Sequence, residues 1–98
     1  MAVKREQLRP EWFVLNWAAQ TDRRLVCAGR IGRKEEKQTW MLSWSNRQAS
    51  IVTVSGWLGT RTVERDLPPN MREMGEFIEL AYSYVISVTV ERSVENGK

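Results

Sequence analysis

Between residues 11 and 66, short stretches of the chain alternate apolar and polar side chains, which is the pattern of strands that bury one face. The clearest stretch is 39–45, where Trp40, Leu42 and Trp44 fall on one face and Met41 on the other. Four further stretches also favour strands, and turn-forming residues separate them: 12–17, 25–31, 50–58 and 61–66. The pattern predicts an antiparallel meander.

Two details of this meander follow from the local sequence. Strict alternation in the first stretch places Phe13, Leu15 and Trp17 on one face, although the run 18–20 (Ala-Ala-Gln) also allows a helix that begins after Pro10. Near the other end, the pair Gly59-Thr60 has the composition of a two-residue hairpin turn. We therefore expect this pair to join the last two strands.

A helix is predicted for residues 70–90. Pro68 and Pro69 end the strand pattern, and Asn70 follows as a candidate N-cap with Glu73 three residues later. The apolar stripe of this amphipathic helix consists of Met71, Met74, Ile78, Ala81, Val85 and Val88.

These elements predict the fold class α+β, with a small antiparallel β-meander followed by a C-terminal amphipathic helix. A length of 98 residues suits one domain. Within it we expect a flexible N-terminal arm over 1–10, mainly strands over 11–66 and the helix over 70–90. The apolar stripe of the helix is expected to cover the sheet, and a dimer interface is the alternative.

Composition favours a binding protein over an enzyme. The chain has five tryptophans and no histidine, so the usual general base near neutral pH is missing. Tryptophan is enriched at interaction hot spots but also fills small cores, and we weigh the two roles equally for Trp40 and Trp44. No cofactor motif and no zinc ligand set is evident.

Positive charge is concentrated in the first part of the chain. Residues 1–38 hold nine lysines and arginines against five acidic residues, and the rest is slightly acidic. Arginine is a hot-spot residue and also binds phosphates. We therefore predict a partner-binding site that combines Trp40 or Trp44 with Arg23, Arg24 and Arg30, and we keep direct DNA contact as an alternative.

One short motif is also found in a class of enzymes, so we consider whether it forms a catalytic site. Residues 35–37 (Glu-Glu-Lys) have the E-x-K form of Mg²⁺-dependent nucleases, and Asp22 lies upstream. The triplet falls in a polar, turn-like segment, whereas such a site needs a supporting strand. We therefore expect no catalytic residue and no metal here.

The remaining features concern compartment and conformation. Cys27 is the only cysteine and lies in an apolar run, as expected for a buried thiol in a reducing cytosol. No stretch has the length of a membrane span, and the N-terminal residues do not resemble a signal peptide. The bonds preceding Pro68 and Pro69 can adopt cis isomers, so these prolines are a candidate contact for a cyclophilin-type prolyl isomerase.

Three segments carry a resemblance to a known family. Residues 9–17 (RPEWFVLNW), 39–45 (TWMLSWS) and 66–71 (DLPPNM) are similar to the small anti-RecBCD proteins of lambdoid bacteriophages. The similarity extends over most of the chain and involves no defined motif, so it transfers no catalytic residue.

This resemblance implies a phage-encoded protein of the host cytoplasm. Such a protein binds the host RecBCD helicase-nuclease through its RecC subunit and changes the exonuclease and recombination activities of the enzyme. The expected result is protection of phage DNA ends and DNA recombination that the phage can use.

Overall fold

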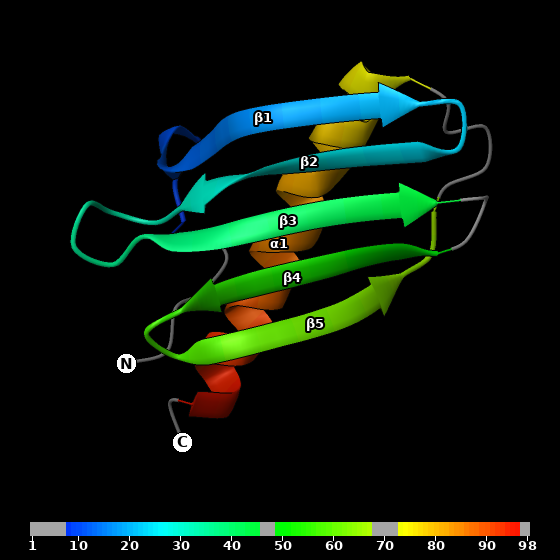
Figure 1. Cartoon of the computed structure of the whole chain (residues 1–98). Coiled ribbons are helices and arrows are strands. Elements are labelled where there is room, and N and C mark those ends of the chain that lie inside the picture. The colour runs from blue at the N-terminus through cyan, green and yellow to red at the C-terminus, as the bar shows by residue number, and fades with distance from the viewer. Residues whose placement is uncertain (1–7, 46–48, 68–72, 97–98) are drawn as a thin grey trace.

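Five consecutive strands form one sheet, and a single long helix crosses behind it (Figure 1). This computed structural model describes residues 8–45, 49–67 and 73–96. A short 3-10 turn at Pro10–Trp12 precedes the sheet. The elements are β1 (Phe13–Thr21), β2 (Arg24–Ile31), β3 (Gln38–Ser45), β4 (Ser50–Gly56), β5 (Gly59–Arg65) and α1 (Met74–Asn96).

The strand order in the sheet is the order in the sequence, β1-β2-β3-β4-β5, and each strand is antiparallel to the next. The predicted α+β fold, a meander followed by a C-terminal helix, is therefore confirmed. Of the arm expected over 1–10, residues 1–7 lie outside the described residues. Leu8 packs against the core, and Pro10 begins the 3-10 turn.

The core lies between the sheet and α1. The alternation predicted for β3 is confirmed, because Trp40 and Leu42 are buried while Met41 is exposed. The buried apolar cluster takes residues from three strands and from the helix: Leu25, Cys27, Ile31, Trp40, Leu42, Val52, Val54, Phe77, Ala81, Val85, Ile86 and Val88.

Aromatic rings fix the beginning of β1 on this core. The ring of Phe13 stacks on Trp40 with centroids 4.7 Å apart and meets Tyr82 of α1 edge-on at 5.1 Å. The Trp40 indole N–H donates to the carbonyl oxygen of Arg30 over 3.1 Å. Gly29 permits this close approach, because a Cβ there would lie 1.8 Å from the Val14 carbonyl oxygen and 2.8 Å from the Trp40 ring.

The facing of β1 differs from the prediction. From Phe13 to Thr21 the segment is a strand, so the alternative helix that begins after Pro10 does not form beyond the 3-10 turn Pro10–Trp12. However, the pairing of β1 with β2 shifts between Leu15 and Trp17, where an extra residue forms a bulge. Trp17 therefore lies on the opposite face from Phe13 and Leu15, whereas strict alternation placed all three together.

The turn between β4 and β5 also differs from the prediction. Gly56 pairs with Gly59, so Trp57 and Leu58 form the two-residue turn in place of Gly59-Thr60. Gly59 follows the turn with φ +100°, a conformation that favours glycine. The glycine signal was correct for the hairpin but misplaced its turn by two positions.

The helix extends further than predicted, to Asn96. The expected limit near residue 90 is wrong because polar side chains continue its buried side: Thr89, Arg92 and Ser93 are buried there. The Arg92 guanidinium donates to the carbonyl oxygen of Val54 over 2.6 Å, which compensates part of the cost of burying it. At the other end α1 begins at Met74, so the prediction that Glu73 lies inside the helix is wrong, while the candidate N-cap Asn70 and Met71 lie outside the described residues.

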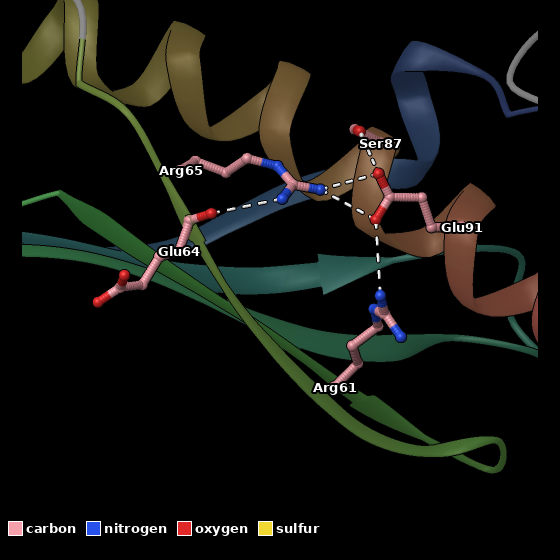
Figure 2. Close-up of polar contacts among 5 residues, drawn as sticks. All are labelled: Arg61, Glu64, Arg65, Ser87 and Glu91. Carbon is pink, nitrogen blue, oxygen red and sulfur yellow. Dashed lines mark hydrogen bonds and ion pairs between the residues drawn. The ribbon is translucent and has the colours of Figure 1, made fainter.

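Polar contacts join the other edge of the sheet to the helix (Figure 2). Arg65 of β5 binds both carboxylate oxygens of Glu91 in α1 at 2.9 Å, and Arg61 lies 4.0 Å from the same carboxylate. The Tyr84 hydroxyl donates to the carbonyl oxygen of Asp66 just after β5. These contacts hold β5 and the chain that follows it against α1.

We expect Phe77→Ala to be the most informative test of this core. The side chain is fully buried between α1 and the sheet, so its truncation leaves a cavity and lowers the free energy of unfolding by about 3–5 kcal/mol. Denaturant titration followed by circular dichroism measures this loss. Trp57→Ala is the matched control, because a 67% exposed aromatic should change stability by less than about 0.5 kcal/mol.

A second expectation concerns the thiol of Cys27. Burial raises its pKa from 9.0 to about 12, because a thiolate is poorly solvated in the core. The neutral thiol therefore contributes its full stability below pH 9, and this contribution is lost as the pH rises toward 12. A colorimetric thiol reagent at pH 8 should label the native chain only as fast as it unfolds. Rapid labelling of the native chain would contradict this burial.

Candidate binding surface

The face of the sheet turned away from α1 is covered by no helix or strand within the described ranges 8–45, 49–67 and 73–96 (Figure 1). We call it the open face. Strand register assigns its residues, because directly paired residues point to the same side. They are Val14, Trp17, Ala19, Thr21, Arg24, Val26, Ala28, Arg30, Thr39, Met41, Ser43, Ser45, Ile51, Thr53, Ser55, Thr60, Thr62 and Glu64.

An apolar strip crosses the open face from β1 to β4. Trp17 pairs with Ala28, which pairs with Met41, and Ile51 lies in the neighbouring row. Trp17, Met41 and Ile51 are 50%, 38% and 40% exposed. Val26 of the same strip is buried although no helix covers it. Contiguous exposed apolar surface of this kind marks an interaction site more often than scattered residues do.

Two arginines flank the strip. Arg30 occupies the row of Val14 and Thr39, and Arg24 occupies the row of Thr21. Both arginine side chains are exposed. The centres of protein interfaces are typically enriched in tryptophan, methionine and arginine, and this surface combines the three residue types.

The part of the open face on β4 and β5 is different in character. Thr53 and Thr62 share a hydrogen bond of 3.0 Å across the strands, and the Thr60 hydroxyl donates to Ser55 over 3.1 Å. These hydroxyls bind one another, so a partner gains less from them than from the apolar strip. The candidate binding surface is therefore the β1–β4 part of the open face, from Arg24 to Arg30.

The structure separates the tryptophans and arginines that the sequence grouped together. Trp40 is 2% exposed and Trp44 is half-buried, and both point toward α1. Arg24 and Arg30 point to the open face, while Arg23 lies in the turn between β1 and β2. Of the two roles weighed equally for Trp40, the structure gives it the core role, and the expected aromatic anchor moves to Trp17.

Sequence reasoning missed Trp17 and Met41 for separable reasons. Trp17 was assigned to the other face because the bulge after Leu15 leaves no clear mark in the sequence. Met41 was correctly assigned to the face of the sheet that Trp40 does not occupy. Its position on that outer face was the sequence signal for a role in binding. Trp57 is 67% exposed, but it lies in the turn between β4 and β5 and not on the open face.

The E-x-K motif is not assembled into a site. Glu35 and Lys37 are exposed in the loop that follows β2, whereas Asp22 lies in the turn that precedes β2. The eight residues of β2 separate them, a distance of about 25 Å along an extended strand. Arg33 in the same loop binds Glu36 at 2.9 Å and lies over the Trp12 ring at 5.9 Å.

Comparisons with known proteins add no relative. No protein-family model, no curated protein and no solved structure matches the chain. Among the helices of the described residues, none is both long and apolar enough to cross a membrane.

We expect the double variant Glu35→Ala, Lys37→Ala to behave like the parent chain toward DNA. The separation of Asp22 from this loop leaves no site for a Mg²⁺-bound water. Incubation with linear single- and double-stranded DNA and Mg²⁺ or Mn²⁺ should give background cleavage for both proteins. Cleavage by the parent chain that disappears in the double variant would contradict this expectation.

Proposed function

We propose that this chain is a phage-encoded protein that binds the host RecBCD helicase-nuclease through RecC and modulates its exonuclease and recombination activities in the host cytoplasm. The resemblance of residues 9–17, 39–45 and 66–71 to anti-RecBCD proteins supplies the partner. The observation that carries the binding role is the apolar strip around Trp17 and Met41 between two exposed arginines. We therefore propose a binding protein that acts without catalysing a reaction.

A protein partner suits this surface better than a nucleic acid does. Nucleic-acid interfaces depend on many cations along the phosphate path. The open face carries only Arg24 and Arg30, and Glu64 adds the opposite charge at its far edge. The exposed apolar area of Trp17, Met41 and Ile51 instead favours a partner that buries it away from water.

Binding alone can change the enzyme in two ways. RecBCD shifts its conformation if this chain binds one state more tightly than another, because a ligand biases an equilibrium only by its differential affinity. Alternatively, the bound chain blocks a DNA path sterically. Either effect protects DNA ends from degradation, and neither needs a catalytic residue.

Direct DNA binding remains the second candidate. The observation in its favour is the position of the Trp17 ring, exposed on the same face as Arg24 and Arg30. A base stacked on such a ring with phosphates on the arginines is a known arrangement for single strands. Such binding weakens steeply with salt, whereas an apolar protein interface persists.

A further partner was predicted at the two consecutive prolines. Pro68 and Pro69 lie outside the described residues, so the contact with a cyclophilin-type prolyl isomerase stays a prediction.

The direct test is capture of purified RecBCD by the tagged chain at moderate salt, with and without a DNA end. We expect stoichiometric capture without DNA, because the exposed apolar strip favours a protein partner. Capture of DNA with no RecBCD retained would overturn the proposal and favour the second candidate.

Variants of the candidate binding surface make the test specific. We expect Trp17→Ala to raise the Kd for RecBCD about 30-fold, as for a typical hot-spot tryptophan, and Met41→Ala to raise it by less. Trp57→Ala is the matched control, since it removes an equally large exposed ring outside the surface. Equal losses for Trp17→Ala and Trp57→Ala would place the interface elsewhere.

A further inference from the structure

Apart from the bulge after Leu15, the edge strand β1 lacks the usual protection against pairing. Its nine residues, Phe13–Thr21, include no charged side chain and no proline. Eight of the nine are exposed, among them Val14 at 37%, Leu15 at 39% and Trp17 at 50%. Within the described part of the chain β1 pairs with β2 alone, so its outer row of backbone N–H and C=O groups is available to another strand.

The opposite edge of the sheet is protected in two ways. β5 carries Arg61, Glu64 and Arg65. Both arginines form ion pairs with Glu91 of α1, as Figure 2 shows, so these contacts hold the helix against this edge. Charged residues and coverage by a helix are the devices that prevent edge-to-edge association. Their presence on β5 and absence from β1 mark β1 as the edge that pairs.

We propose that β1 pairs antiparallel with β1 of a second copy of this chain, so that the two sheets become one. A twofold axis between Asn16 and Trp17 places Leu15 opposite Ala18 of the second copy and Val14 opposite Ala19. Because the bulge reverses the alternation at this point, Leu15 and Ala18 share the α1 side, and Val14 and Ala19 share the open face. Both of these opposed pairs then have their side chains on one side of the joined sheet, and they are apolar on both chains.

The second copy is favoured over other occupants by this self-complementarity. A strand without charges meets no like charge when it pairs with itself. The alternative contact of β1 with β5 of a neighbour is heterologous and generates a ring or an open filament, and the charged, helix-bound β5 edge opposes it. A twofold β1–β1 contact closes on itself and leaves no free apolar edge.

This dimer is independent of the proposed function, because it uses the backbone edge of β1 and leaves the open face exposed. The two open faces would join across the axis, which brings the two Trp17 rings to the centre of a doubled surface. Measuring the molecular mass tests the dimer, and capture of RecBCD tests the proposed function. Failure of one proposal can therefore be distinguished from failure of the other.

The first test is the mass of the purified full chain by light scattering coupled to size exclusion, and by sedimentation equilibrium. We expect a mass of two chains that falls toward one on dilution. A single-chain mass at every soluble concentration would overturn the proposal. Binding of a host protein to β1 would not rescue it.

Two variants test the register. Leu15→Lys combined with Ala18→Lys opposes like charges across the axis, and we expect the two-chain mass to fall to one. Leu15→Lys combined with Ala18→Glu opposes unlike charges, and we expect the dimer to be retained. Both positions are exposed in the single chain, so thermal melting should show folded protein in each case.

The control is Thr62→Lys, which adds one positive charge to the exposed surface of β5. We expect it to stay dimeric. Equal masses for the two β1 variants, or a dimer that Thr62→Lys dissociates, would contradict pairing through β1.

Discussion

One helix packs on one side of a five-stranded sheet, and this packing determines where the core lies and which surfaces stay exposed. A sheet must bury at least one face, and α1 provides the only helical cover within residues 8–45, 49–67 and 73–96. The core is therefore a single layer of side chains between α1 and the strands, with Phe77 and Trp40 as its largest rings. The other face of the sheet remains open, so its side chains serve solubility or binding.

The position of the helix also explains why the two edges of the sheet differ. Ion pairs from Arg65 and Arg61 to Glu91 tie α1 to β5, whereas most of β1 extends beyond the cover of the helix. The same arrangement thus creates a protected edge, an unprotected edge and an open face with an apolar strip. Binding surface and edge strand meet at Trp17, which belongs to both.

Much of this architecture could be predicted from the sequence, because period-two alternation and paired prolines are strong local signals. The face of Trp17 could not be predicted, since a one-residue bulge is set by pairing with β2 and reverses every facing beyond it. The end of the helix was missed because Thr89, Arg92 and Ser93 are polar yet buried. The composition of the candidate site depended on these facings: Arg24 and Arg30 lie on the open face, whereas Trp40 and Trp44 point toward α1.

Hydroxyl-radical footprinting shows whether the open face between Arg24 and Arg30 contacts the partner, because tryptophan and methionine side chains report their own exposure by oxidation. With RecBCD bound, we expect strong protection of Trp17 and Met41 and unchanged oxidation of Trp57, which is exposed outside this surface. Protection of Trp57 or of α1 residues, with Trp17 and Met41 still oxidised at the rate of the free chain, would contradict this expectation.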